Sequence, residues 1–204
     1  MKIIGHPLGA YQANCYIVYD ENTKDGFIID PGDEGSTILD VINREKLNIK
    51  FIILTHGHFD HIGAVNKIKE ALNIPVYMNE KDGFMIKSGK QKIGMAYPKF
   101  ENFNPDRFVT EGDTISCGGN TIEIIETPGH TPGGISIKLD GYVFTGDTLF
   151  AGSIGRYDFE GGSFEDIVNS IKNKLFTLPD DTIVCPGHGQ GTKIGIEKET
   201  SSFF

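Results

Sequence analysis

Cysteine is scarce in this sequence of 204 residues, and no pair has the spacing of a metal or redox motif. Cys15, Cys117 and Cys185 lie far apart, which fits neither a disulfide framework nor a thiolate zinc site. We therefore expect three buried small side chains. The first residues also lack a long apolar run, so we expect no secretory signal, no membrane span and a cytoplasmic location.

Basic residues are also few. The chain has 19 Lys and Arg against 28 Asp and Glu, a formal charge of −9, and no run of Lys or Arg stands out. Such a surface repels polyanions, so nucleic acid is not an expected partner. The 38% of hydrophobic and 23% of charged residues are typical of a globular chain, and its length fits one domain over residues 1–204.

Short apolar runs rich in β-branched residues alternate with segments of helical spacing, an order that predicts an α/β fold. We expect strands at residues 14–20, 26–30, 50–54, 76–78, 121–126, 134–139 and 142–145, with 182–185 as the last strand. We expect helices from residue 36, over 64–72 and over 164–175, and a loop at 55–62. Two stretches share one order: strands, a helix, then a strand that leads into a histidine-bearing loop. This order indicates a duplicated architecture.

The segment 80–113 has no regular pattern and carries scattered aromatic and Met residues, among them Phe84, Met95, Tyr97 and Phe108. One interpretation is a lid over a site. The other is that these side chains anchor a long connection onto the core.

Three histidines and an aspartate fall within six residues directly after the strand expected at 50–54. They are His56, His58, Asp60 and His61. Imidazole and carboxylate together suit zinc, iron or manganese, and a loop at a strand end lets alternate side chains converge. The alternative is a solvated polar loop.

Three further side chains favour the metal interpretation. His130, Asp147 and His188 each follow an apolar strand, and His6 is the one histidine outside these clusters. Glycines beside them permit the tight turns and close approach that a metal site needs. We therefore predict a metal site where several strands end at one edge of the fold.

The strings HGHFDH, TPGHTPGG, FTGDTLF and PGHG together resemble the metallo-β-lactamase superfamily, over essentially the whole chain. The longer strings at 146–156 and 192–199 are similar to the glyoxalase II, or hydroxyacylglutathione hydrolase, branch and above all to its short bacterial members. The resemblance implies a four-layer αββα sandwich with a metal site at one edge of its two sheets.

The resemblance also implies a role for each side chain. His56, His58 and His130 would hold one divalent metal, Asp60, His61 and His188 a second, and Asp147 would bridge the two. Zinc is the expected metal, with iron or manganese as alternatives. Asp60 and Asp147 would serve catalysis, in which a metal-bound hydroxide attacks the substrate. Asp30 either supports these ligands through hydrogen bonds or merely forms an Asp-Pro-Gly turn.

Two metals that activate water indicate a hydrolase, and a thiol leaves without the dedicated acid that an amine needs. This chemistry favours a small thioester over an amide, and the resemblance to glyoxalase II implies a substrate like S-D-lactoylglutathione. Only 16 residues follow His188, too few for the C-terminal helical domain that helps glyoxalase II hold glutathione. Arg156 and Tyr157 match positions that contact the thiol part of the substrate, unless they form a surface salt bridge and a packed ring.

Two other functions remain as alternatives. A persulfide dioxygenase of the same fold would hold one iron by His56, His130 and Asp147, and would leave Asp60, His61 and His188 to support those ligands. The second alternative is a metal-binding protein that catalyses no reaction. The string at 151–156 resembles the short glyoxalase II group, which favours the hydrolase.

Overall fold

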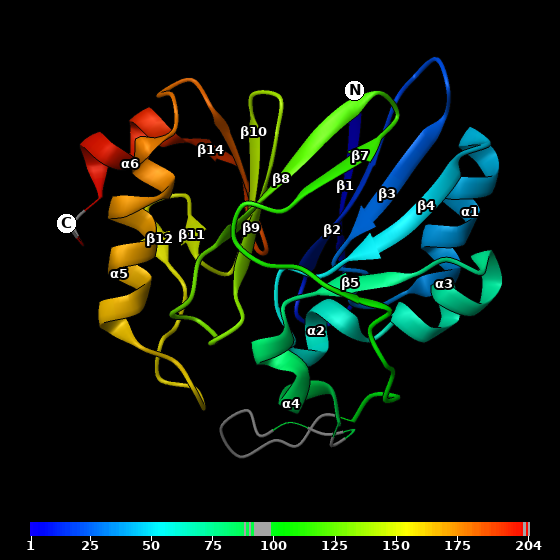
Figure 1. The fold of residues 1–204 in the computed structure, drawn as a ribbon, viewed down its shortest axis with the longest axis horizontal. Helices are drawn as coiled ribbons and strands as arrows, with labels where there is room; N and C mark the ends of the chain where they lie inside the picture. Colours follow the sequence, from blue (N-terminus) through cyan, green and yellow to red (C-terminus); the bar gives the residue numbers. More distant parts are fainter. Residues whose placement is uncertain (88, 90, 92–98, 202, 204) are drawn as a thin grey trace.

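The computed structural model describes residues 1–87, 89, 91, 99–201 and 203. Two six-stranded sheets pack face to face, and helices cover the outer face of each, so the predicted four-layer αββα sandwich is present (Figure 1). No helix among these residues is long and apolar enough to cross a membrane. All three cysteines are buried and free, as predicted.

The N-terminal sheet has its strands in chain order. They are β1 (Lys2–Leu8), β2 (Ala13–Tyr19), β3 (Asp25–Ile29), β4 (Asn48–Ile53), β5 (Val76–Met78) and β6 (Arg107–Phe108). The first three strands pair antiparallel and the last three continue parallel to β3. Its outer face carries α1 (Gly35–Glu45) and α3 (Val65–Leu72), which lie on the right in Figure 1.

The C-terminal sheet has the order β14 (Thr192–Lys193), β13 (Ile183–Pro186), β10 (Tyr142–Gly146), β9 (Ile135–Leu139), β8 (Asn120–Glu126) and β7 (Thr114–Cys117). On its outer side lie α5 (Phe164–Asn173) and α6 (Ile194–Thr200), at the left of Figure 1. The short helix η2 (Leu175–Thr177) follows α5 in the chain. A separate hairpin joins β11 (Leu149–Phe150) to β12 (Ser153–Ile154).

Three apolar clusters separate the four layers, because successive side chains of a strand point to opposite faces. In β4, Phe51 and Ile53 pack between the two sheets, while Ile52 packs toward α1 and α3. In β10, Phe144 lies between the sheets and Val143 faces α5. Strands buried on both faces explain the continuous apolar runs of the sequence.

The predicted shared order is present in both halves. The strand β3 runs through α1 into parallel β4, and β10 connects through α5 to parallel β13. Each of these pairs extends an antiparallel partner, β2 in one sheet and β9 in the other. The loops after β4 and β13 carry histidines, and they meet at the same edge of the molecule.

Several elements differ from the sequence predictions. The loop predicted at 55–62 contains the single turn α2 (Phe59–Ile62), and 182–185 is not the last strand because β14 and α6 follow. The strands β1 and β7 were not predicted. The elements α2, β7 and β14 have four residues or fewer, too few for a period to stand out, and the exposed residues of β1 do not alternate regularly.

The segment predicted to be irregular contains η1 (Glu80–Asp82), α4 (Gly83–Lys87) and β6. Phe84 and Phe108 are exposed, at 45% and 47%, so neither anchors the connection onto the core. Phe103, in contrast, is buried in the cluster under α1 and α3. Met95 and Tyr97 lie outside the described residues.

Candidate metal centre

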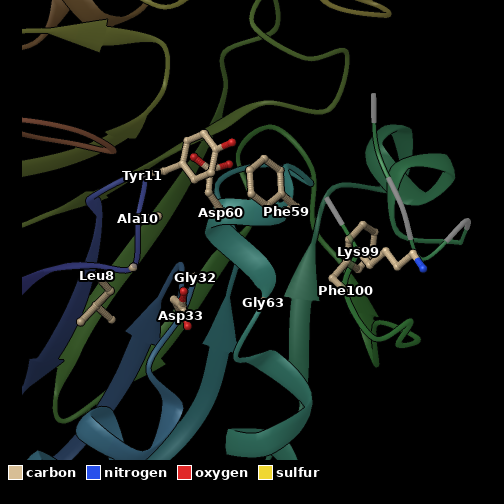
Figure 2. A pocket seen from close by; sticks show the side chains of 11 residues that line it. Leu8, Ala10, Tyr11, Gly32, Asp33, Phe59, Asp60, Gly63, Lys99 and Phe100 are labelled. Atoms are coloured by element: carbon tan, nitrogen blue, oxygen red, sulfur yellow. The ribbon is translucent and has the colours of Figure 1, made fainter. Parts of the chain in front are cut away.

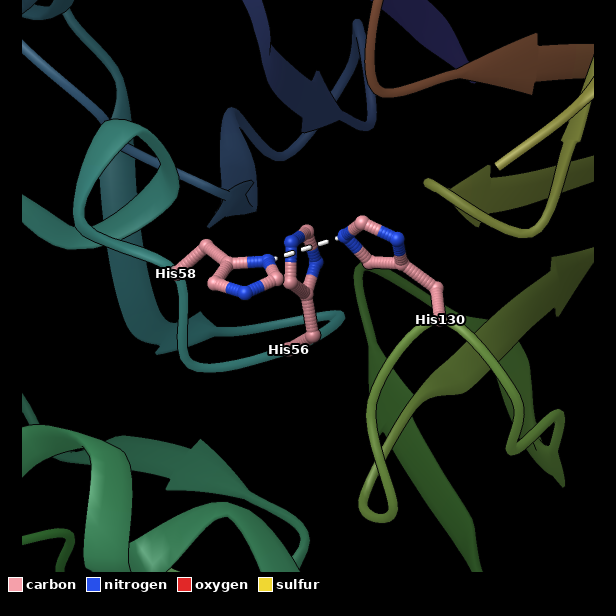
Figure 3. Close-up of side chains that lie close together, drawn as sticks. All are labelled: His56, His58 and His130. Atoms are coloured by element: carbon pink, nitrogen blue, oxygen red, sulfur yellow. Dashed lines mark hydrogen bonds between the residues drawn. The ribbon is translucent and has the colours of Figure 1, made fainter. Parts of the chain in front are cut away.

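All seven predicted ligand side chains lie at one edge of the sandwich. Four of them follow β4 of the first sheet: His56, His58, Asp60 and His61. The other three follow strands of the second sheet: His130 follows β8, Asp147 follows β10 and His188 follows β13. Figure 3 shows His56 and His58 on one loop facing His130 on the opposite loop. The two sheets thus contribute ligands to the same space.

Close approach of backbone and side chains makes glycine necessary at this edge. A Cβ on Gly187 would collide with Asp147 Oδ1 and lie 2.8 Å from His61 Cε1. Gly146 adopts a left-handed φ of 49°, which favours glycine, and a Cβ there would overlap the Thr55 side chain. Gly187 lets the loop after β13 approach the ligands, and Gly146 lets the end of β10 approach Thr55 in the loop after β4.

The first donor group consists of His56, His58 and His130, whose ligand nitrogens lie within 4.8 Å of one another. All three side chains are buried, and His58 Nδ1 lies 2.8 Å from His130 Nε2. Burial and the neighbouring imidazole of His130 lower the pKa of His58 to about 3. His58 is therefore neutral at pH 7, with a nitrogen lone pair available to a metal.

The second donor group consists of Asp60, His61 and His188, again with ligand atoms within 4.8 Å. His188 Nε2 lies 3.3 Å from Asp60 Oδ2. Burial alone would lower the pKa of His61, but the charges of Asp147 and Asp30 outweigh it and raise the pKa to about 10. His61 thus keeps a proton between carboxylates, at a position where a cation would replace that proton.

Asp147 lies between the two groups. Its Oδ2 is 3.5 Å from His130 Nε2 and 3.6 Å from His188 Nε2, and its Oδ1 is 3.5 Å from His61 Nε2. One carboxylate therefore reaches nitrogens of both groups. This is the arrangement that a bridging ligand needs.

Two buried atoms of the site test whether it fits a metal. His56 Nε2 and Asp147 Oδ1 have no hydrogen-bond partner among the described residues. Leaving a buried polar atom unpaired costs about 1–3 kcal/mol each. Divalent cations would satisfy both atoms, and nitrogen and carboxylate donors match zinc, iron or manganese. The residues fit a two-metal centre.

Asp30 supports the second group through hydrogen bonds. Its Oδ1 accepts from Thr55 N at 2.8 Å, and its Oδ2 contacts Thr55 Oγ1 at 2.5 Å and His61 Nδ1 at 3.0 Å. These contacts occupy both carboxylate oxygens. Asp30 therefore orients His61 rather than offering a free ligand atom.

Sequence reasoning missed Asp82. It is fully buried in η1 and accepts hydrogen bonds from the loops that carry His56, His58 and His130. No motif marks it, since in the sequence it looks like the exposed Glu80 beside it. Only the packing of η1 against these loops distinguishes the two.

A cavity of about 290 Å³ opens over the ligands. Aromatic side chains form much of its wall: Tyr11, Phe59, Phe150 and Phe159, joined by Arg156 and by the ligands His58, Asp60, His130, Asp147 and His188. A second cavity of about 300 Å³ lies on the other side of Tyr11 and Phe59 (Figure 2), and these two rings pack edge to face at 4.9 Å. The aromatic pair divides the two spaces.

The two predicted substrate contacts differ in position. Arg156 lines the first cavity, with its guanidinium 4.1 Å from the Phe159 ring centroid, and it is paired with Asp158 at 2.8 Å. Tyr157 does not line that cavity. Its ring packs against Phe164 instead, with centroids 4.9 Å apart.

A family model described as the metallo-β-lactamase superfamily matches residues 8–188. The chain belongs to this superfamily. Its sequence is 42% identical to that of hydroxyacylglutathione hydrolase GloC of Haemophilus influenzae, over 97% of this chain and 95% of that protein. The predicted resemblance is thereby confirmed.

Two crystal structures extend the comparison. The structure of BLEG-1 B3 metallo-β-lactamase superimposes on this chain with a TM-score of 0.93 and 35% sequence identity, covering 99% of each chain. TTHA1623 in a di-iron-bound form gives a TM-score of 0.84 and 37% identity, covering 98% of this chain and 100% of that one. The fold is confirmed, and one neighbour holds two irons in it.

Proposed function

We propose that this superfamily member is a glyoxalase II-like hydrolase that cleaves a small thioester. The observation that carries the proposal is the pair of donor groups joined by Asp147 beneath an aromatic cavity. Similarity to a hydroxyacylglutathione hydrolase over nearly the whole chain supports the reaction class.

The roles of the ligands follow from their positions. His56, His58 and His130 would hold one cation and Asp60, His61 and His188 the other, with Asp147 shared between them. Bound divalent cations supply two things, a water of lowered pKa and positive charge for the oxygen of the attacked carbonyl. We propose zinc, with iron or manganese as metals that the same donors accept.

The remaining residues act on the substrate. Phe150 and Phe159 line the cavity beside the ligands, with ring centroids 6.3 Å from His188 and 5.8 Å from His130, so they exclude water from the reacting carbonyl. Arg156 lies at the open rim, where its guanidinium can pair with a carboxylate on the thiol carrier. The thiolate then leaves without a dedicated acid.

The test combines metal content with turnover. We expect the purified protein to bind two metals per chain and, with oxygen excluded, to release thiol from S-D-lactoylglutathione and from thioesters of other small thiols. One bound iron with oxygen uptake on a persulfide would establish a dioxygenase instead. Two bound metals with no turnover of any thioester would contradict the proposed reaction.

A further inference from the structure

Asp82 is a buried carboxylate that no predicted role explains. Its side chain is 0% exposed, and no salt bridge to it occurs among the described residues. Three donors replace a counter-ion: Gly57 N at 3.0 Å and Thr131 Oγ1 at 2.8 Å to Oδ2, and Gly133 N at 2.6 Å to Oδ1. A buried carboxylate is stabilised only when its oxygens are satisfied in this way.

The three donors lie in two ligand loops, each beside a ligand of the first group. Gly57 lies between His56 and His58, while Thr131 and Gly133 follow His130. The carboxylate therefore ties the loop after β4 to the loop after β8, from beneath the first donor group. None of its hydrogen bonds reaches Asp60, His61 or His188.

The loops leave space for this carboxylate. A Cβ on Gly133 would lie 2.6 Å from both the backbone nitrogen and the Oδ1 of Asp82, and one on Gly57 would lie 3.3 Å from the Cβ of Asp82. A side chain on Gly133 would force the loop away from the carboxylate. The close contact between η1 and the ligand loops thus depends on small residues at the points where Asp82 is bound.

Asp30 is a second buried carboxylate at this edge. It contacts His61 directly and reaches His56 through Thr55, whose Oγ1 lies 2.5 Å from Asp30 Oδ2 and 3.0 Å from His56 Nδ1. Asp30 therefore supports ligands of both donor groups, whereas the hydrogen bonds of Asp82 lie beside ligands of the first group alone.

We propose that Asp82 is a positioning residue that sets the metal affinity of the first donor group and leaves the second unaffected. This inference rests on the proposed two-metal centre but not on the thioester reaction. Asparagine cannot replace the carboxylate, because its NH2 group would face the N–H of either Gly57 or Gly133. Loss of a partner that orients metal ligands typically weakens affinity by about 10–100-fold.

The experiment measures the metal affinity of each group alone. His188→Ala leaves the first group as the complete one, and His58→Ala leaves the second as the complete one, each with Asp147. Co(II) absorption and competition with a chelator give the dissociation constant for the remaining metal. Adding Asp82→Asn should weaken the His188→Ala protein by about 10–100-fold and change the His58→Ala protein by less than about two-fold. Asp30→Asn, which loses contacts to His61 and, through Thr55, to His56, should weaken both proteins.

Matched variants separate positioning from general destabilisation. Glu197 is another buried carboxylate, 1% exposed, that accepts hydrogen bonds from Thr192 Oγ1 and Gly152 N away from both donor groups. Glu197→Gln should lower thermal stability yet leave both metal affinities intact. Thr131→Val removes one donor to Asp82 without removing the carboxylate, and should give a smaller weakening confined to the first group.

Three results would overturn the proposal. Asp82→Asn could weaken both groups equally, or leave the first group unchanged, or the His188→Ala protein could bind no metal at all. If Asp82→Asn does not fold, Thr131→Val decides by the same criterion. Wild-type protein with two metals but no thioester turnover would refute the proposed reaction while leaving this inference in place.

Discussion

Among single residues, Asp147 has the broadest role because one carboxylate lies near nitrogens of both donor groups. Its Oδ1 is also buried without a hydrogen-bond partner among the described residues. The other predicted ligands each belong to one group. A change at Asp147 should therefore affect both metals, whereas a change elsewhere should affect one.

Asp147→Asn removes the bridging charge and replaces one ligand oxygen by an amide nitrogen, which is a poor metal ligand. We expect the affinity for both metals to fall and the turnover of metal-saturated enzyme to decrease by at least about ten-fold. Elemental analysis and steady-state kinetics at saturating metal measure the two effects. Unchanged binding of either metal would show that Asp147 does not bridge.

Arg156 is the residue that can connect the site to the thiol carrier. Its partner Asp158 competes for the guanidinium, but the two side chains are 61% and 59% exposed, and exposed pairs stabilise little. A carboxylate on the substrate can therefore replace Asp158. Arg156→Ala should raise KM by about ten-fold and leave kcat largely intact, because the contact is remote from the reacting carbonyl.

Kinetics on thioesters with and without a carboxylate in the thiol part test this role. The increase in KM should occur for the anionic substrates alone. Arg44→Ala, which removes an exposed guanidinium on α1, serves as the control and should change neither constant. A strong preference for anionic thioesters that survives Arg156→Ala would place recognition elsewhere on the chain.

At the scale of helices and strands, the elements that the sequence predicted best are those whose two faces are buried. The strands β3, β4 and β10 are buried on both faces, so their apolar runs were visible in the sequence. The strand β1 lies at the sheet edge, its exposed residues are irregularly spaced and it includes Pro7, so it gave no such signal. The single turn α2 is too short for a helical period.

In the candidate site, too, some residues could be predicted from the sequence and others could not. His56, His130 and His188 follow apolar strands, so their spacing and their resemblance to a family placed them together. Asp82 could not be found this way, because its role depends on three donors that are 25 to 51 residues away in the chain. For Tyr157 the sequence left two interpretations open, and adjacency to Arg156 could not decide between them: its ring packs against Phe164 and does not line the cavity.

The contact between α3 and β5 provides a prediction about pH. Asp106 Oδ2 binds Lys69 Nζ at 2.6 Å and accepts from Val76 N at 2.8 Å. Burial alone would raise the pKa of Asp106, but these two donors outweigh it and lower the pKa. Its stabilising effect is thus complete above the unfolded-state pKa of about 4 and is lost as pH falls through the lower folded-state pKa.

Asp106→Asn keeps an oxygen for Val76 N and removes the charge. The variant should be less stable than wild type by about 0.5 kcal/mol at pH 7, a small value because Asp106 is 43% exposed. The difference should shrink toward zero below about pH 4. Urea denaturation of both proteins across this range, at equal metal loading, measures it. A difference that does not change with pH would contradict the role of the charge.

At the scale of the whole molecule, the metal centre joins the two halves of the sandwich. The loop after β4 belongs to the first sheet, whereas the loops after β8, β10 and β13 belong to the second. Each donor group takes ligands from both sheets: His130 completes the first and His188 the second. Without a cation the imidazoles that converge there are buried and disfavour one another's charge, and burial and the neighbouring His130 lower the pKa of His58 to about 3.

Metal removal should therefore loosen the contact between the sheets as well as abolish activity. A ligand at 100 times its dissociation constant stabilises the folded state by about 2.7 kcal/mol per site. We expect chelation to lower the midpoint of thermal unfolding by several degrees and restored zinc to recover it, as measured by calorimetry. His188→Ala, which removes one group, should show a smaller decrease on chelation than wild type. Equal decreases in the two proteins would show that the second group contributes nothing to holding the sheets together.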